Sequence, residues 1–374
     1  MGRNIKRSSE NQTISPTIGR EQLRLLAKLC NACAVSGDEG EVRAIVLEQI
    51  RPYVDEVNID ALGNVLALRA GLGKERMRVM VASHMDEVGM MVTHAEDKNE
   101  GLFRFEIVGG INETQIPGKP VWIGHKHIPG VIGSKPVHLT NKDELDNTLS
   151  LDVLRIDCGP GNGEKVNIGD RVVFSTRFKR LGPSLRAKAL DDRLGVVTLI
   201  ELLKHSYPNI DLMAAFTVQE EVGLRGARVA AFALDPQIAI VLDCTPAYDL
   251  PALEKNGLSG EENTRYNTRL GDGPAIYLSD SGTIYDRRLV QHFTQTATEL
   301  SIPFQFRQPG SGSTDAGTIH KQRTGIPSIA ISVPGRYLHT AAALVRLEDW
   351  INHMTLVYAG LSRLEPGILN YERG

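Results

Sequence analysis

Strands and helices alternate along the second half of the chain, and this alternation restricts the fold more than any other sequence feature. Apolar runs of strand length are separated by amphipathic stretches of helix length. Continuous apolar strands are typical of parallel sheets that are buried on both faces. The pattern therefore predicts an α/β fold, with a mainly parallel central sheet and helices on both faces. The expected strands are 211–218, 237–244, 275–279, 304–307 and 328–333, and the expected helices are 191–205, 225–233, 287–300, 315–323 and 348–364.

The first half predicts the start of the same domain and then an interruption. Helices are expected at 20–34 and 41–51, and strands at 58–70 and 77–92. From about 95 to 184 the sequence changes to short Val- and Ile-rich runs separated by Gly and Pro, which is typical of a small all-β module. The predicted domains are an α/β domain formed by residues 20–94 and 185–374, an inserted β-barrel-like domain at 95–184, and a disordered N-terminal extension at 1–19.

Charge and hydropathy argue against several classes of protein. Lys and Arg total 42 and Asp and Glu total 45, so the formal net charge is −3 and no basic excess points to nucleic acid. No apolar stretch approaches the roughly 18 residues of a membrane span. The basic N-terminal segment has no apolar signal-peptide core. We therefore expect a cytoplasmic protein that binds neither nucleic acid nor membrane.

The four cysteines are too few and too scattered to form a disulfide framework. Cys30 and Cys33 form a C-x-x-C pair, but it lies late in the expected helix at 20–34 and no second pair complements it. We interpret both cysteines as core-facing side chains and not as a redox or zinc site.

Histidine and carboxylate residues follow four of the apolar runs, and one further aspartate opens the helix after the β module. In open α/β sheets, ligands bind beyond the carboxyl ends of the strands. Each such residue alone would be read as a helix cap or a solvated charge, but carboxylates gathered at one rim repel one another unless cations lie among them. The residues concerned are His84, Asp86, Asp191, Glu220, Glu221, Asp243 and His339.

Two histidines and three carboxylates suit a pair of divalent ions, with a hydroxide completing the charge balance. Such a site lowers the pKa of its bound water. It also binds both the attacking oxygen and the carbonyl oxygen. Asp86 lies two residues beyond His84, on the same face of an extended strand, so it can hold the imidazole tautomer. Glu220 and Glu221 diverge as neighbours at a strand end, which allows one to bind metal and the other to act as general base.

Seven sequence pieces together resemble the M42 family of metallo-aminopeptidases, which includes glutamyl aminopeptidase and the tetrahedral aminopeptidases. They occur in the family's order and extend the resemblance from about residue 20 to the end of the chain. The pieces are SGDEGEVR (36–43), SHMDEVG (83–89), KALDDRLG (188–195), VQEEVGLRGA (218–227), LDCTPA (242–247), STDAG (313–317) and GRYLHT (335–340).

The resemblance implies a zinc-peptidase-like fold and a role for each candidate residue. It implies that Glu221 and His339 bind one ion, that His84 and Asp243 bind the other, and that Asp191 bridges both. Both ions would be divalent, Zn²⁺ or Co²⁺. Glu220 would be the general base and Asp86 the partner of His84.

The resemblance also implies the reaction and the assembly. The chain is expected to be a dinuclear aminopeptidase that removes N-terminal residues from short peptides with a free N-terminus, using the water that bridges the metals. The inserted domain would mediate assembly into dimers that build dodecamers.

Two sequence features depart from the family pattern. Ser313 stands where a glycine usually precedes TDAG, and the polar stretch at 248–272 is longer than expected. Both could change the shape of the substrate pocket, and neither removes a predicted metal ligand.

Three other functions are possible for a chain with these residues. A deacylase or carboxypeptidase would use the same dinuclear centre. An endoglucanase is disfavoured because Glu220 and Glu221 are adjacent and cannot flank a glycosidic bond. A non-catalytic assembly protein is disfavoured because every predicted ligand and the base are present.

Overall fold

The computed structural model describes residues 16–135, 138, 140, 149–250, 267–307 and 312–370. Residues 1–15 of the expected N-terminal extension and residues 251–266 of the long polar stretch lie outside the described residues.

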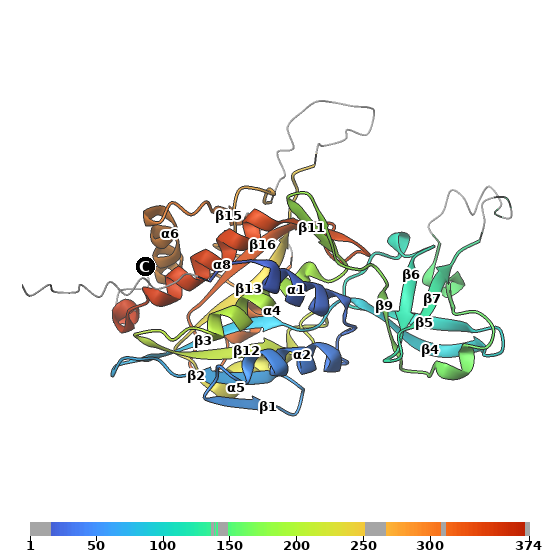
Figure 1. The fold of residues 1–374 in the computed structure, drawn as a ribbon, viewed down its shortest axis with the longest axis horizontal. Coiled ribbons are helices and arrows are strands. Elements are labelled where there is room, and N and C mark those ends of the chain that lie inside the picture. Colours follow the sequence, from blue (N-terminus) through green and yellow to red (C-terminus); the bar gives the residue numbers. More distant parts are fainter. Residues whose placement is uncertain are drawn as a thin grey trace, which may run out of the picture.

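An eleven-stranded sheet forms the centre of the larger domain (Figure 1). Its strands follow the order β1-β2-β12-β3-β13-β16-β17-β11-β10, and β14 and β15 extend from β16. Their bounds are β1 Glu56–Ile59, β2 Val65–Arg69, β3 Met77–His84, β10 Lys179–Leu181, β11 Ser184–Ala187, β12 Ile210–Thr217, β13 Ile238–Pro246, β14 Ala275–Tyr277, β15 Gln305–Arg307, β16 Ser328–Arg336 and β17 Ala343–Arg346.

The sheet is mixed, so the prediction of a mainly parallel sheet is wrong for its flanks. The four central strands β12, β3, β13 and β16 run parallel, as the continuous apolar runs predict. The flanking strands pair antiparallel. For β1 and β2 the reason is a short connection. The single strand expected at 58–70 folds back at Gly63 (φ +102°) into the hairpin of β1 and β2, and a tight turn joins only antiparallel strands.

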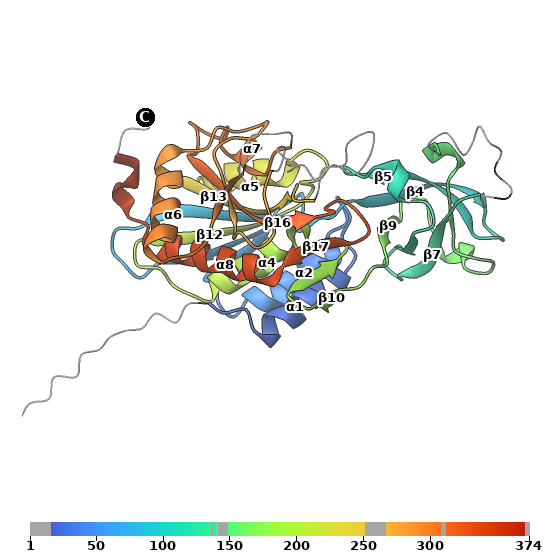
Figure 2. The same cartoon turned by 90° about the horizontal axis from the view of Figure 1, so that it is seen from above.

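Helices cover both faces of the sheet, as predicted (Figure 2). One face packs against α1, α2, α4, α6 and α8, with Leu26, Leu199 and Leu356 in its core. The other face packs against α5 and α7, with Ala230 and Ala316 in its core. The helix bounds are α1 Arg20–Asn31, α2 Gly40–Ile50, α4 Leu190–Leu203, α5 Arg225–Leu234, α6 Arg287–Glu299, α7 Ala316–Ile319 and α8 Leu347–Ser362, with short 3₁₀ helices at Glu113–Gln115, Leu151–Val153, Gly163–Lys165 and Pro366–Asn370.

The inserted segment forms a closed barrel beside the larger domain (Figure 1). Its strands, in barrel order, are β4 (Gly89–Asp97), β5 (Leu102–Val108), β8 (Arg155–Asp157), β7 (Ile128–Gly133), β6 (Pro120–Ile123) and β9 (Arg171–Phe174). Met90, Phe103 and Val172 lie in its own apolar core.

The barrel strands occupy residues 89–174, which differs from the expected range 95–184. The run expected as one strand at 77–92 ends at His84 and resumes as β4 at Gly89. Gly89 permits this crossing into the barrel, because a β-carbon there would lie 2.4 Å from Val35 Cγ2. At the other end, β10 and β11 pair with the large sheet and not with the barrel.

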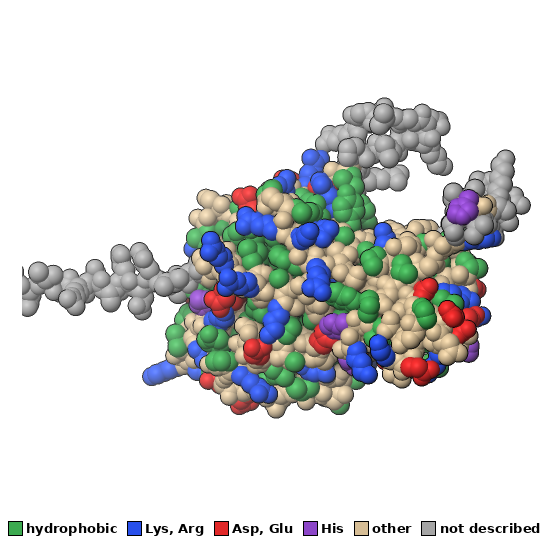
Figure 3. Space-filling view, turned by 45° about the vertical axis from the view of Figure 1, so that its right-hand side comes forward, with side chains coloured by type: hydrophobic (Ala, Val, Ile, Leu, Met, Phe, Trp, Pro, Cys, Tyr) green, Lys and Arg blue, Asp and Glu red, His purple; other side chains and the backbone are tan. Residues whose placement is uncertain are grey.

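Charged side chains of both signs are scattered over the larger domain, with lysine and arginine lying among aspartate and glutamate (Figure 3). Within the described ranges, no helix is both long enough and apolar enough to cross a membrane.

A buried histidine in α8 makes folding sensitive to acid. His353 is fully buried, its Nε2 donates to Ile331 O at 2.9 Å, and burial lowers its pKa to about 4. Below pH 6.5 this histidine binds a proton in the unfolded chain but not in the folded chain, so stability is lost as pH falls. We expect this histidine to account for about 2 kcal/mol of lost stability between pH 7 and pH 5. His353→Gln retains an Nε2–H donor but does not titrate in this range. Between pH 7 and pH 5 its free energy of unfolding in urea should therefore fall by about 2 kcal/mol less than that of wild type. An equal loss in both proteins would contradict the assignment.

Candidate active site

The predicted site residues converge at the carboxyl ends of the central parallel strands. His84 ends β3, Glu220 and Glu221 follow β12, and Asp243 lies near the end of β13. His339 follows β16, and Asp191 lies in the first turn of α4. The buried apolar strands end at one edge of the sheet, so their terminal polar residues share that edge.

Asp191 lies between the two histidines. Its Oδ1 is 3.2 Å from His84 Nε2, and its Oδ2 is 3.5 Å from His339 Nε2. Asp243 Oδ1 is 3.8 Å from His84 Nε2, and Glu221 Oε2 is 3.2 Å from His339 Nε2. The five residues therefore form two groups, His84–Asp191–Asp243 and Asp191–Glu221–His339, and within each group one ligand atom per residue lies within 4.8 Å of the others.

Backbone carbonyls orient both imidazoles. His84 Nδ1 donates to Asp86 O at 3.1 Å, and His339 Nδ1 donates to Gly110 O at 3.1 Å. In the neutral form, each ring therefore presents an unprotonated Nε2 to Asp191. Metal-binding histidines are typically held in this way, through the nitrogen that does not face the metal.

Asp86 has a wider role than the sequence predicts. Its carboxylate is 3.5 Å from His84 Nδ1, but it also accepts the backbone N–H of Glu220 at 3.0 Å and of Glu221 at 3.1 Å. Ser36 Oγ donates to it at 2.6 Å. Burial alone would raise its pKa, but the His84 interaction and these hydrogen bonds outweigh that effect and lower it. Asp86 thus remains charged and fixes the loop that carries both glutamates.

The inserted barrel domain contributes backbone atoms to this site. Gly110 follows β5, and its carbonyl orients His339. A β-carbon at Gly110 would lie 3.1 Å from His339 Nδ1, and one at Gly109 would lie 3.4 Å from Glu221 Cβ. Glycines therefore let the backbone of the inserted domain approach the two residues closely.

The buried carboxylates lack enough positive charge in the protein itself. Burial, the largest cause, raises the pKa of Glu221 to about 8 and of Asp243 to about 6, and the nearby Asp191 carboxylate adds to both shifts. Burial and the neighbouring acids also raise the pKa of Glu220. The two histidines, by contrast, hold the pKa of Asp191 below its usual range, against the effect of its burial. Divalent cations would supply the missing charge, and His nitrogen and carboxylate oxygen are ligands that Zn²⁺ accepts.

A cavity of about 230 Å³ opens beside these residues. This is smaller than a typical pocket for a drug-sized molecule and suits a single terminal residue. Besides the five clustered residues it is lined by Glu220, Cys244, Pro246, Tyr277, Arg307, Gly312, Ser313, Thr314 and Leu338.

Two polar residues at the site went unrecognised in the sequence. Asp315 is buried, accepts Thr217 Oγ1 at 2.6 Å, and has its pKa raised to about 7 by burial. It belongs to the STDAG piece, which was the available signal. Arg307 is 4% exposed, lines the cavity and lies 4.8 Å from the Tyr277 ring centre. No sequence signal identified it, because it lies in β15, which among the described strands pairs with β14 alone.

Ser313 is accommodated without loss of the cluster. Its hydroxyl donates to Thr314 O at 3.3 Å and faces Gly282 and Gly317, where a β-carbon would lie 2.4 Å from the oxygen. The two glycines therefore leave room for the side chain that departs from the expected glycine pair.

Comparisons with known proteins agree over nearly the whole chain. Residues 63–356 match the sequence profile of the family described as M42 glutamyl aminopeptidase. The chain is 33% identical to the lysyl aminopeptidase of Pyrococcus furiosus, over 91% of this chain and 97% of that protein. An aminopeptidase structure from the archaeon Desulfurococcus kamchatkensis superposes with a TM-score of 0.85 at 32% identity, covering 93% of this chain and 96% of that one. The TET1 peptidase of Pyrococcus horikoshii, which can assemble into a tetrahedron or a large octahedral shell, superposes with a TM-score of 0.78 at 30% identity, covering 92% and 100%.

Proposed function

The chain belongs to the M42 glutamyl aminopeptidase family and is a metal-dependent aminopeptidase, and we propose that it works with two divalent ions per subunit on short peptides with a free N-terminus. The observation that carries this proposal is the position of Asp191 between His84 and His339, in two ligand groups that share this one carboxylate. His84 and Asp243 would hold one ion, Glu221 and His339 the other, and Asp191 would bridge them. Zn²⁺ and Co²⁺ both fit these ligands.

When bound, the ions would lower the pKa of a water molecule and polarise the scissile carbonyl. The protein's own groups do the rest of the work. Nδ1 hydrogen bonds hold both imidazoles in one tautomer, and Asp86 holds the backbone of Glu220 and Glu221 in place. Positioning of this kind reduces the reorganisation that the reaction would otherwise require.

Glu220 is proposed as the general base. It lines the cavity beside the ligand groups and belongs to neither of them. Its carboxylate would take a proton from the attacking water and pass it to the nitrogen of the leaving peptide as the C–N bond breaks.

Metal removal and replacement test this function. The chelated protein, with Zn²⁺ or Co²⁺ added back, should release p-nitroaniline from free aminoacyl-p-nitroanilides, and acetylated forms of the same compounds should remain intact. Equal release of p-nitroaniline from the blocked substrates would indicate an endopeptidase, whereas release of acetate from them would indicate a deacylase. Cleavage only from the carboxyl end of peptides would indicate a carboxypeptidase, and hydrolysis of cellulose that chelators do not affect would indicate an endoglucanase.

Arg307 is proposed to set the side-chain preference of the cavity. A buried guanidinium on the cavity wall favours an acidic terminal residue and disfavours a basic one. Its guanidinium lies over the Tyr277 ring, 4.8 Å from the ring centre, and this contact restricts the movement of a group that suits a carboxylate partner.

We expect Arg307→Gln to lower kcat/KM for glutamyl-p-nitroanilide by roughly 10- to 150-fold, the equivalent of a lost hydrogen bond to a charged group. The leucyl substrate should change by a much smaller factor. Arg307→Lys is the matched control, because it keeps the charge and should keep part of the preference. A proportional fall for both substrates would show that Arg307 supports the structure and does not select the substrate.

Self-assembly through the barrel is also proposed, as dimers that build dodecamers. Val131, Val153 and Ile168 are apolar barrel residues that are 39%, 62% and 65% exposed. The assembly of the similar P. horikoshii peptidase supports a homo-oligomer. Light scattering on the purified protein would give its mass, and a monomer at micromolar concentration would contradict the proposal.

A further inference from the structure

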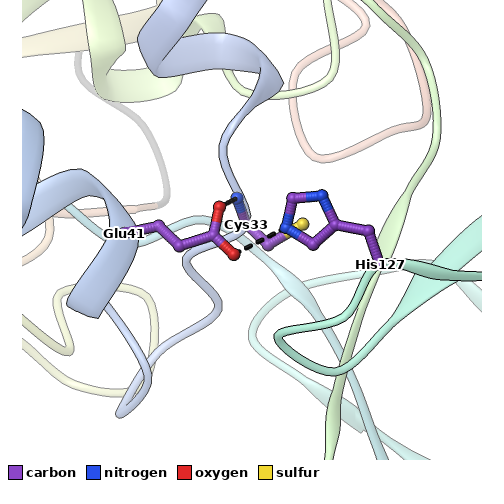
Figure 4. A group of neighbouring side chains, drawn as sticks. All are labelled: Cys33, Glu41 and His127. Atoms are coloured by element: carbon purple, nitrogen blue, oxygen red, sulfur yellow. Dashed lines mark hydrogen bonds and ion pairs between the residues drawn. The ribbon is translucent and has the colours of Figure 1, made fainter.

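A second group of histidine, cysteine and carboxylate side chains, close enough together to hold a metal ion, lies away from the active site, where the barrel meets the larger domain. Figure 4 shows Cys33, Glu41 and His127 converging from three separate segments. Cys33 follows α1, Glu41 lies in the first turn of α2, and His127 lies between β6 and β7 of the barrel. The sequence interpretation of Cys33 as a core side chain is therefore incomplete: Cys30 is fully buried, whereas Cys33 is half-buried beside these two groups.

The three side chains are already held close together. His127 Nε2 lies 2.6 Å from Glu41 Oε1, and the other carboxylate oxygen, Oε2, accepts the backbone N–H of Cys33 at 3.0 Å. The Cys33 sulfur and one ligand atom from each partner lie within 4.8 Å of one another. Glu41 thus contacts the other two residues directly, as the dashed lines in Figure 4 show.

The surroundings fix the histidine and leave it accessible. The His127 ring stacks on Trp122, with ring centres 5.6 Å apart and planes at 12°, and Arg177 covers the same indole at 5.1 Å. The His127 side chain is 36% exposed, so an ion can reach it from solvent. A fixed ring that solvent can reach is suited to capture a metal ion without a large rearrangement.

Cysteine sulfur, imidazole nitrogen and carboxylate oxygen are each ligands that zinc accepts. Tetrahedral zinc with ligands at 2.0–2.3 Å holds those ligands about 3.3–3.8 Å apart. The observed cluster needs adjustments of about an ångström to reach that geometry, with the His127–Glu41 contact opening and the sulfur closing in. Three protein ligands leave a fourth position for water. The thiol also distinguishes this group from the active-site pair, because the proposed active-site ligands are nitrogen and oxygen alone.

We propose that Cys33, Glu41 and His127 bind one zinc ion that ties the barrel to the larger domain. The ion is additional to the active-site pair and joins the α1–α2 region to the barrel at a point distant in sequence. This link would steady the barrel, whose Gly110 carbonyl orients His339.

Cobalt absorption tests the thiolate ligand directly. After chelation, the full-length protein is titrated with Co²⁺ and followed in the near ultraviolet, where sulfur-to-cobalt charge transfer absorbs. Wild type should gain this band and Cys33→Ser should lose it. Cys30→Ser is the matched control, since its thiol donates to Ala189 O at 3.8 Å in the core, and the band should persist there. Cys244→Ser should also retain it, which separates this site from a thiol that lines the active-site cavity.

Metal content gives a second reading. After equilibration with Zn²⁺, wild type should retain one ion per subunit more than Cys33→Ser and more than His127→Gln. His127 lies in an exposed barrel turn, so its variant tests the site even if Cys33→Ser folds poorly. Absence of the charge-transfer band in wild type, its persistence in Cys33→Ser, or equal zinc content in wild type and His127→Gln would each overturn the proposal.

Discussion

Glu220→Gln is expected to lower kcat by a factor on the order of 10²–10⁴ while both active-site ions remain bound. The amide has nearly the shape of the carboxylate but cannot accept a proton from the attacking water. The backbone N–H of residue 220 would still donate to Asp86, so the loop should keep its place. The measurement combines kcat on an aminoacyl-p-nitroanilide with metal content by mass spectrometry.

The neighbouring glutamate supplies the matched control. Glu221 contacts His339 and belongs to a ligand group, so Glu221→Gln should weaken metal binding as well as activity. Retention of full kcat in Glu220→Gln would remove Glu220 from the role of base. Loss of metal from Glu220→Gln would make it a ligand instead.

Asp191→Asn is expected to abolish activity and to leave fewer than two ions per subunit. Asp191 is the one carboxylate common to both ligand groups, and each of its oxygens faces a different histidine. The amide carries no charge and offers a single oxygen acceptor, so it cannot serve two cations. The loss should exceed that in Glu220→Gln, because the proposed ions, which would activate the water, would be lost with their shared ligand.

Isothermal titration of the chelated variant with Zn²⁺ would measure this effect. Asp235→Asn is a surface control of the same chemistry, at a side chain that is 56% exposed. Two tightly bound ions in Asp191→Asn, with activity intact, would show that Asp191 does not bridge the metals.

The sequence predicts the centre of the fold better than its edges. The apolar strands β3 and β13, which carry His84 and Asp243, are buried on both faces, so hydrophobic runs alone locate them. The flanking strands are short and partly exposed, and their pairing depends on turns such as Gly63, which composition does not reveal. The barrel was recognisable as β structure, but its boundaries depend on the close approach at Gly89.

At the active site, too, some residues could be predicted from the sequence and others could not. Residues that end strands could be predicted because parallel topology brings strand ends together. Arg307 and His127 could not, since their positions depend on tertiary contacts between segments far apart in sequence. The carboxylate of Asp86 was predicted to support His84, but its bonds to the Glu220 and Glu221 backbone required the folded loop.

The contact between Gly110 and His339 limits how the two domains can diverge during evolution. An inserted domain that only decorated the surface could be lost, exchanged or lengthened without harm to catalysis. Here the backbone carbonyl of Gly110, in the inserted domain, orients the His339 ring in the other domain. Deletions or insertions near residues 109 and 110 would therefore misalign His339. A barrel transplanted between related enzymes would therefore support catalysis only if Gly109 and Gly110 were transplanted with it.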